Sequence, residues 1–228
     1  MPEHPHAHEH PGAAAAGDRD RFTLDRQAAD WDARYREKDD AIWSGRPNGR
    51  LVTEVGALAA GRALDVGCGE GADAIWLAQR GWDVTAVDVS PLAVERARAA
   101  GRRAGVVVDW VCGDALGAPF PGHSFDLVSL QYPALPKAAG EGALQGLLDS
   151  VRPGGVVLAV YHDLDDEHRA RMADGGFDPS DYVLDAEWRA LLATRDDFTV
   201  ELDVVEPRVD PPGGNPHIAD VVVRARRR

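Results

Sequence analysis

Three carboxylates stand at the ends of apolar runs, in places where a folded chain could use them on a ligand. Asp65 lies next to the end of one run, Asp88 closes a second, and Asp114 follows a third. If these runs are neighbouring parallel strands, their carboxyl ends meet at one edge of the sheet and bring the acids together. Carboxylates there can accept hydrogen bonds from hydroxyl groups and attract a positively charged ligand.

A glycine-rich turn follows the first acid and precedes a helical pattern. Gly67, Gly69 and Gly71 alternate with Cys68 and Glu70. Glycine lets the backbone turn tightly and approach a ligand that a Cβ would block. The helix N-terminus that follows offers unpaired N–H groups and a partial positive charge. The loop therefore suits a ligand that has a negatively charged end.

The acids help to decide which ligand this turn would bind. Asp65 and Glu70 would repel a pyrophosphate at close range, whereas a ligand with an ammonium and a sulfonium would be attracted. Asp88 is placed to accept hydrogen bonds from both hydroxyls of a ribose. The turn also lacks the G-x-G-x-x-G spacing, because Ala72 takes the last place. An NAD(P)-dependent oxidoreductase is therefore a disfavoured alternative.

The stretch Leu-Asp-Val-Gly-Cys-Gly-Glu-Gly at 64–71 resembles motif I of the class I S-adenosylmethionine-dependent methyltransferases. The resemblance extends over roughly residues 60–161, with Gly-Asp-Ala at 113–115 similar to the adenine-contacting turn and Arg-Pro-Gly-Gly at 152–155 similar to the turn before the fifth strand. It implies a methyltransferase that uses S-adenosyl-L-methionine. A looser likeness, based on Trp-Ser-Gly-Arg-Pro-Asn at 43–48, points to the small-molecule branch of tellurite-resistance and thiopurine methyltransferases.

The resemblance also assigns parts of the cofactor to residues. The glycine turn and Asp65 would hold the methionine end, Asp88 the ribose, and Asp114 with Ala115 the adenine, against which Val89 would pack. The complete set of expected cofactor-binding residues is Asp65, Gly67, Cys68, Gly69, Asp88, Val89, Asp114, Ala115, Gln131 and Trp43.

The later strands end in a second group of polar and aromatic side chains. Ligands bind outside the carboxyl ends of the strands in an open α/β sheet, so these side chains are expected to converge beside the methyl group. They are Gln131, Tyr132, Tyr161, His162, Asp163 and His217. The candidate catalytic residues are His162, His217 and Tyr132; either histidine could serve as a base. Structural roles for both histidines stay open, and Tyr132 and Tyr161 are expected to be pocket walls.

Methyl transfer is a displacement at a sulfonium carbon, so much of the catalytic help is alignment and desolvation. The expected acceptor is a small molecule with a soft or weakly polar nucleophile. A protein of the same fold that binds the cofactor without turnover is a further alternative.

Strand and helix patterns alternate along the chain, which predicts a Rossmann-like α/β fold with helices on both faces of a mostly parallel sheet. The resemblance implies the strand order 3-2-1-4-5-7-6 with strand seven antiparallel. The predicted strands are 62–66, 83–88, 106–112, 125–131, 156–161, 198–206 and 218–225, and the predicted helices are 72–79, 91–100, 142–150 and 185–193.

The N-terminal part differs in composition from the rest. Residues 1–17 are rich in His, Pro and Ala and are expected to be a disordered tail; the alternating histidines could chelate a metal, but a solvated tail is favoured and no metal site is predicted. Residues 18–228 are expected to form one methyltransferase domain. Its segment 22–58, which contains Trp31, Tyr35 and Trp43, is expected to form a helical lid over the site.

Composition limits the possible partners. The chain has 228 residues and a net charge of −13, which argues against nucleic acid, since phosphate binding needs a basic surface. Two cysteines suit neither a disulfide framework nor a zinc site and favour a reducing cytoplasm. No run approaches the length of a membrane helix, and no signal peptide is recognisable. The expected partner is a small-molecule methyl acceptor, and the expected state is a monomer or homodimer.

Overall fold

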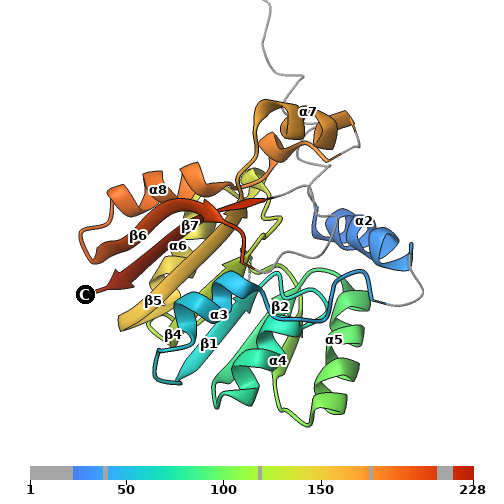
Figure 1. The fold of residues 1–228 in the computed structure, drawn as a ribbon, viewed down its shortest axis with the longest axis horizontal. Coiled ribbons are helices and arrows are strands. Elements are labelled where there is room, and N and C mark those ends of the chain that lie inside the picture. The colour runs from blue at the N-terminus through green and yellow to red at the C-terminus, as the bar shows by residue number, and fades with distance from the viewer. Residues whose placement is uncertain (1–22, 38–40, 118–119, 175–176, 210–217) are drawn as a thin grey trace, which may run out of the picture.

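A computed structural model of the chain describes residues 23–37, 41–117, 120–174, 177–209 and 218–228 (Figure 1). The expected tail at 1–17 and the candidate base His217 lie outside these residues.

Seven strands form one sheet in the order β3-β2-β1-β4-β5-β7-β6. Every pair is parallel except β5 with β7 and β6 with β7, which are antiparallel. The sheet thus confirms the predicted order and the antiparallel last strand. The strands are β1 (Arg62–Val66), β2 (Asp83–Asp88), β3 (Asp109–Cys112), β4 (Phe125–Gln131), β5 (Val151–His162), β6 (Phe198–Pro207) and β7 (Ala219–Arg227).

Helices cover both faces of this sheet, which gives three layers (Figure 1). One apolar cluster joins α3, α4 and α5 to the sheet, and another joins α6 and α8 to the opposite face. The helices are α2 (Leu24–Arg36), α3 (Gly49–Val55), α4 (Ala72–Gln79), α5 (Pro91–Ala104), α6 (Glu141–Ser150), α7 (Asp166–Asp174) and α8 (Asp185–Ala193), with short 3₁₀ turns η2 (Lys137–Ala139) and η3 (Pro179–Asp181).

The central strands are apolar on both sides because helices cover both. In β5, every residue from Val156 to Tyr161 is buried. In β7, Val222 faces the α3–α5 layer, whereas Val221 and Val223 face the α6–α8 layer, as the two-residue period of a strand requires. This double burial explains why the strands were recognisable as continuous apolar runs.

Two predicted strand starts are wrong by more than one residue. β3 begins at Asp109 rather than at residue 106, and Val107 is 92% exposed. The valines before β3 therefore belong to the connection from α5, although their β-branched side chains favour a strand. β5 begins at Val151, five residues before its predicted start, and a register shift accommodates the Pro-Gly-Gly segment beside β4.

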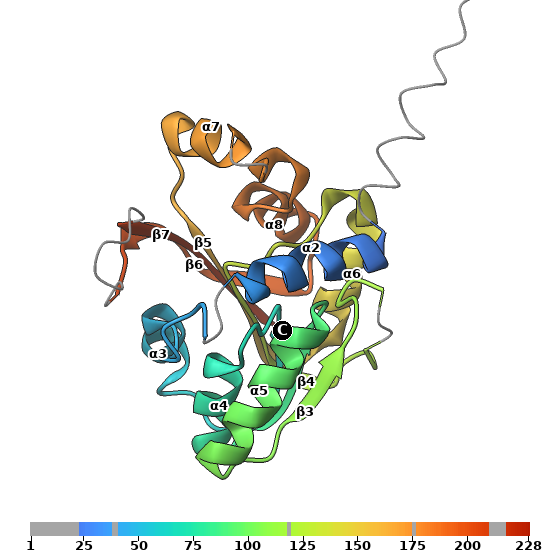
Figure 2. The same cartoon turned by 90° about the vertical axis from the view of Figure 1, so that its right-hand side faces the viewer.

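The segment expected to be a lid has two parts. α3 belongs to the body of the fold, with Leu51 and Val55 buried in the core. α2 instead lies between α5 and α7 in both views (Figures 1 and 2). The lid expectation therefore applies to α2 and residues 41–48.

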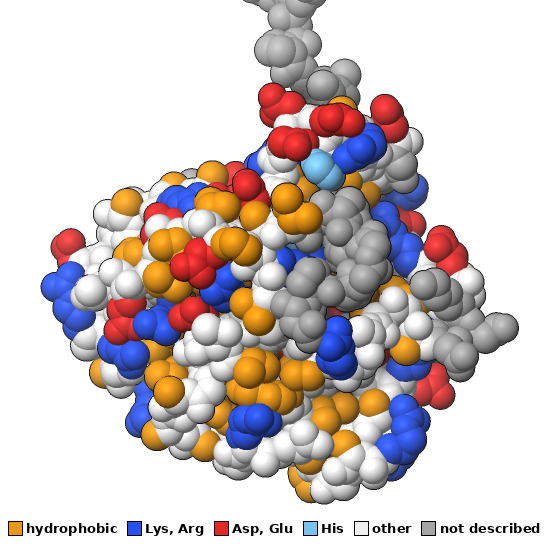
Figure 3. Space-filling view, in the orientation of Figure 1, with side chains coloured by type: hydrophobic (Ala, Val, Ile, Leu, Met, Phe, Trp, Pro, Cys, Tyr) orange, Lys and Arg blue, Asp and Glu red, His pale blue; other side chains and the backbone are white. Residues whose placement is uncertain are grey.

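Acidic and basic side chains are interspersed over the face seen in Figure 3, and acidic side chains gather over α7 at its top. Among the described residues, no helix is long and apolar enough to cross a bilayer.

Candidate functional site

The glycine turn between β1 and α4 is built from left-handed backbone conformations. Gly67, Gly69 and Gly71 have φ angles of 70°, 53° and 87°. A Cβ at Gly71 would lie 2.6 Å from Cη2 of Trp110, so this position excludes a side chain for steric reasons as well. The N–H groups of Gly67 and Cys68 donate to the carbonyl of Val87 at 2.9 and 3.0 Å. The turn is therefore attached to the end of β2.

Cys68 is a packing residue within this turn. Its side chain is buried, and burial raises the pKa of the thiol well above its ordinary value, with the charges of Asp65 and Asp88 adding to the effect. A thiol in these surroundings is a poor nucleophile.

Asp65 is buried below the turn, with 2% of its surface exposed. It accepts a hydrogen bond from the N–H of Ala74 in the first turn of α4. Burial, followed by the charges of Asp73 and Asp88, raises its carboxyl pKa well above the ordinary value. The oxygen Oδ2 is buried without a hydrogen-bond partner in the structure. An unpaired buried carboxylate oxygen favours a cation or a hydrogen-bond donor nearby.

Asp88 stands beside the turn at the end of β2. Its two oxygens accept hydrogen bonds from the N–H groups of Gly69 and Ser90, both at 2.9 Å. Burial raises its pKa, and the charge of Asp32 on α2 also raises it. Each carboxylate oxygen can accept further hydrogen bonds, so the carboxylate retains capacity for the hydroxyls of a ribose.

The predicted adenine side of the site follows β3. Gly113 donates its N–H to the carbonyl of Asp88 at 2.9 Å, and Asp114 Oδ1 accepts from the N–H of Leu116 at 2.8 Å. Ala115 is buried in the core, and the carbonyl of Val89 accepts a weak contact from the thiol of Cys112 at 3.8 Å. These residues thus lie on neighbouring strand ends, since Asp88 and Cys112 are paired in register.

Residues before β1 cover the turn through aromatic side chains. The indole Nε1 of Trp43 donates to the hydroxyl of Tyr35 at 3.2 Å. A Cβ at Gly69 would lie 3.0 Å from that hydroxyl. Tyr35 is buried, and burial raises its pKa, whereas Trp43 is 54% exposed. Trp43 is therefore next to the turn, as a cofactor contact requires. Tyr35, which was expected only as part of the lid segment, lies beside the turn as well.

Glu70 fastens this covering segment to the turn. It accepts hydrogen bonds from the N–H groups of Ile42 and Trp43 at 3.3 and 3.1 Å, and it forms an ion pair with Arg96 at 2.9 Å. The negative charge of Glu70 is therefore compensated by groups of the protein itself. The expected repulsion of a pyrophosphate then depends on Asp65 and Asp88 rather than on Glu70.

Two more carboxylates attach residues before β1 to the site, and neither was predicted. Asp32 on α2 accepts from Ser90 Oγ at 2.5 Å and from the N–H of Leu92 at 3.2 Å, at the start of α5. Asp73 accepts from both the N–H and the side-chain amide of Asn48, each at 2.7 Å. Asn48 immediately precedes α3, but its side chain makes no capping hydrogen bond there and donates to α4 instead.

The ends of β4 and β5 bring together only some of the expected residues. The rings of Tyr132 and His162 stack with their centroids 4.2 Å apart. Gln131 is buried, donates to Ser129 Oγ at 3.2 Å, and has an Oε1 atom without a hydrogen-bond partner. Asp163 follows β5, where its N–H donates to the carbonyl of Ala219 at 3.0 Å.

Tyr161 is not a pocket wall. Its side chain points to the opposite face of β5 from that of His162 and is 4% exposed. Its hydroxyl accepts from the indole Nε1 of Trp188 on α8 at 2.7 Å, and burial raises its pKa. The alternation of side chains along the strand therefore removes Tyr161 from the site.

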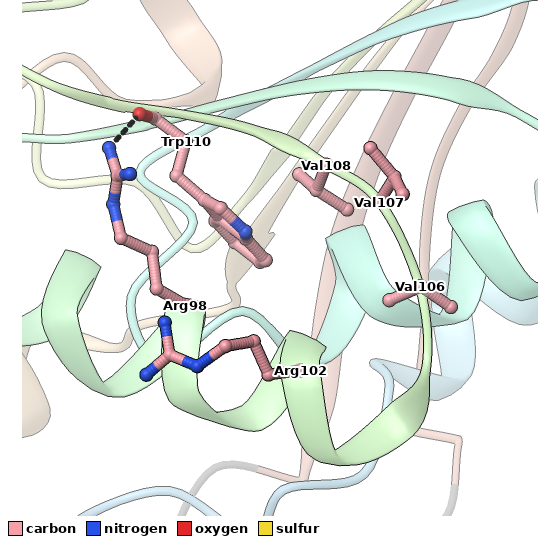
Figure 4. A pocket seen from close by; sticks show the side chains of 6 residues that line it. All are labelled: Arg98, Arg102, Val106, Val107, Val108 and Trp110. Atoms are coloured by element: carbon pink, nitrogen blue, oxygen red, sulfur yellow. Dashed lines mark hydrogen bonds between the residues drawn. The ribbon is translucent and has the colours of Figure 1, made fainter.

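A cavity of about 230 Å³ lies between α5 and the chain leading into β3 (Figure 4). Arg98 and Arg102 line it together with the valines at 106–108 and Trp110, and Arg98 donates to the carbonyl of Trp110 at 2.5 Å. None of the candidate site residues lines this cavity. Among the described residues, no group of His, Cys, Asp and Glu side chains is arranged to hold a metal ion.

Comparison with known proteins agrees with this geometry. Residues 63–155 match the protein family described as a methyltransferase domain. The demethylmenaquinone methyltransferase of Renibacterium salmoninarum is 33% identical over 112 residues, which cover 49% of this chain and 46% of that protein. The chain spans about half the length of the curated relatives that it matches.

Solved structures are similar to this fold over most of the chain. A structure from work on the conversion of a disulfide bond into a thioacetal group during echinomycin biosynthesis has a TM-score of 0.67 and 28% identity, and covers 88% of this chain and 92% of that one. TehB from Haemophilus influenzae has a TM-score of 0.60 and 15% identity, and covers 86% of this chain and 67% of its own. The likeness to TehB is therefore one of fold.

The fold and the matched domain point to the same class of protein. Residues 63–155 match a methyltransferase domain, and the strand order of the whole sheet is the one expected from the resemblance to the class I S-adenosylmethionine-dependent methyltransferases. The cofactor of this class is S-adenosylmethionine. The site fits that molecule, because the glycine turn leaves room for close approach and the unpaired oxygens of Asp65 and Gln131 suit a cationic ligand.

Proposed function

We propose that this protein transfers a methyl group from S-adenosylmethionine to a small molecule whose nucleophile is soft, with sulfur as the first candidate. The observation that carries the proposal is the set of carboxylates and the glycine turn at one edge of a methyltransferase sheet. A sulfur acceptor is supported by the similarity to the structure connected with conversion of a disulfide into a thioacetal.

The acceptor is proposed to be small for two reasons. α2 and residues 41–48 are attached directly to the glycine turn and to α5, which limits the space above the site. The net charge of −13 disfavours a nucleic acid. Two free cysteines, Cys68 and Cys112, support a reducing cytoplasmic location.

Each part of the cofactor has proposed partners among the residues described above. The glycine turn with Asp65 and Gln131 would hold the methionine end, and Trp43 would lie over it. Asp88 would hold the ribose. The adenine would lie against Val89, near Asp114 and Ala115.

The cofactor supplies an activated methyl group, so the protein's task is to align the acceptor and exclude water. The stacked rings of Tyr132 and His162 lie at the strand ends where this alignment is needed. If the acceptor is a thiol rather than a thiolate, His162 is the proposed base for its proton, because an imidazole can accept a proton near neutral pH. Tyr132 is unsuited to that task, since burial and the charge of Asp220 raise the pKa of its phenol.

The proposal is tested by incubating the protein with S-adenosylmethionine labelled in the methyl group and with thiophenol, 2-mercaptoethanol or glycine. We expect labelled thioethers to form faster than any product from glycine. Binding of S-adenosylhomocysteine without transfer to either thiol would contradict the sulfur proposal and would favour a protein that binds the cofactor without turnover.

A further inference from the structure

Tyr132 has a backbone conformation that is unusual for a large side chain. Its φ angle is +52°, and among the non-glycine residues that the structure describes only His123 shares a positive value. Such a conformation is unfavourable for a bulky residue and persists only where its surroundings hold it. It occurs directly after β4, at the edge of the sheet where the acceptor is proposed to bind.

Two hydrogen bonds hold this residue at both ends. Its N–H donates to the carbonyl of Val160 on β5 at 2.8 Å. Its hydroxyl donates to Asp220 Oδ1 on β7 at 2.9 Å. Tyr132 is therefore fixed to two neighbouring strands, and its side chain cannot rotate without breaking the second bond.

The ring of Tyr132 also has planar neighbours. It stacks on His162, with ring centroids 4.2 Å apart and planes 18° apart, and the guanidinium of Arg208 lies 4.7 Å from its centroid. His162 and Asp220 are direct partners in the antiparallel pairing of β5 and β7. One strand pair thus supplies both the ring that stacks on Tyr132 and the carboxylate that holds its hydroxyl.

Asp220 is an unusual residue to find in this place. It has no exposed surface, and its second oxygen, Oδ2, has no hydrogen-bond partner in the structure. Burial raises its pKa, while the hydrogen bond from Tyr132 and the charges of Arg208 and Arg50 act in the opposite direction. A buried carboxylate contributes little to stability compared with a well-packed apolar residue. We therefore expect Asp220 to have a specific role other than stabilising the fold.

We propose that Asp220 is a positioning residue for methyl transfer: it holds Tyr132 in its strained conformation, and Tyr132 in turn orients the ring of His162 against the acceptor. The inference rests on the proposed function, because it assumes that the acceptor binds at this edge. Asp220 acts through Tyr132, whose hydroxyl stands between it and the neighbouring ring.

Three variants separate positioning from other roles. Tyr132→Phe removes the hydroxyl, Asp220→Leu removes the acceptor oxygen, and Asp220→Asn keeps an acceptor oxygen but removes the charge. With thiophenol as acceptor, we expect Tyr132→Phe and Asp220→Leu to lower kcat about tenfold or more, because small misalignments of reactants are costly. Asp220→Asn should stay within about threefold of the wild type, since the hydrogen bond can still form.

Binding of the cofactor should not change in these variants. The KM for S-adenosylmethionine is expected to stay within about twofold in all three variants, because the residues that hold the cofactor are unchanged. Glu206→Gln is the matched control, because Glu206 is the partner of Asp220 on the other neighbouring strand and contacts Arg50 rather than Tyr132. It should leave kcat unchanged.

A second measurement does not depend on turnover. The measurement is an NMR spectrum of protein with labelled tyrosine and histidine rings. In Asp220→Leu, the resonances of Tyr132 and His162 should both move, because the stacked rings shield each other. In Asp220→Asn, both resonances should stay close to those of the wild type. If the wild-type protein methylates no thiol, the sulfur proposal fails while these resonances still decide the positioning. An equal loss of kcat in Asp220→Asn and Asp220→Leu, or unmoved resonances in Asp220→Leu, would overturn the inference.

Discussion

At the scale of single residues, the site combines carboxylates whose roles differ although their residue type is the same. Asp65 and Asp88 retain acceptor capacity at the strand ends. Glu70 is fully engaged by Arg96 and two backbone N–H groups. The sequence shows where the carboxylates are. It does not show which of them is free to face a ligand, because that depends on hydrogen-bond and ion-pair partners that are distant in the chain.

Asp65 makes the stability of the ligand-free protein depend on pH. Burial raises its folded-state pKa above the ordinary value of 3.8, so the folded state binds more protons than the unfolded state between the two values. Stability contributed by the protonated form is therefore lost as the pH rises through this window. We expect the Tm of the wild type to fall more than the Tm of Asp65→Asn, which cannot ionise at this position, as the pH is raised from about 4 to about 8.

Differential scanning fluorimetry over this range is a sufficient measurement. Asp83→Asn is the control, because Asp83 lies on the neighbouring strand with its side chain 84% exposed. An Asp65→Asn curve parallel to that of the wild type would show that the buried carboxylate does not determine this slope.

At the scale of elements, α2 and residues 41–48 are attached to the sheet by polar contacts. Asp32 caps the start of α5, and Glu70 accepts the N–H groups of Ile42 and Trp43. Elements attached in this way open more readily than those that share a large apolar core. We therefore propose that this segment opens to admit a ligand while the sheet stays intact.

Replacing Glu70 with Ala should loosen this segment selectively. Both backbone N–H groups lose their acceptor, so hydrogen exchange of the Ile42 and Trp43 amides should accelerate at least about fivefold, while amides of β1 stay protected. Glu95→Ala is the control, because Glu95 is exposed and adjacent to Arg96. Unchanged exchange at Ile42 and Trp43 would mean that other contacts hold the segment.

The elements were predictable from the sequence to different degrees. β1, β2 and β4 have their predicted bounds because each is a buried apolar run between turns. β3 was predicted too long, since β-branched residues favour a strand even where no partner strand is available. Tyr161 was misplaced because its partner, Trp188, is 27 residues away. The contacts of Asp32, Tyr35 and Asp220 likewise join distant segments, and no local pattern indicates them.

At the scale of the whole molecule, the fold places most of the candidate site residues at one edge of the sheet. Strand order and pairing bring the ends of β1, β2 and β3 together, and the ends of β4 and β5 beside them. Helices cover both faces, so the edge carries the residues available for ligands. The central claim is that this edge holds the nucleoside of S-adenosylmethionine, with Asp88 on the ribose.

Calorimetric titration with S-adenosylhomocysteine tests that claim most directly. We predict binding of one molecule per chain, a loss of roughly 1–3 kcal/mol in Asp88→Ala because two ribose hydrogen bonds disappear, and no change in Asp83→Ala at the opposite end of the same strand. Absence of binding at millimolar ligand, or equal affinity in wild type and Asp88→Ala, would contradict the account.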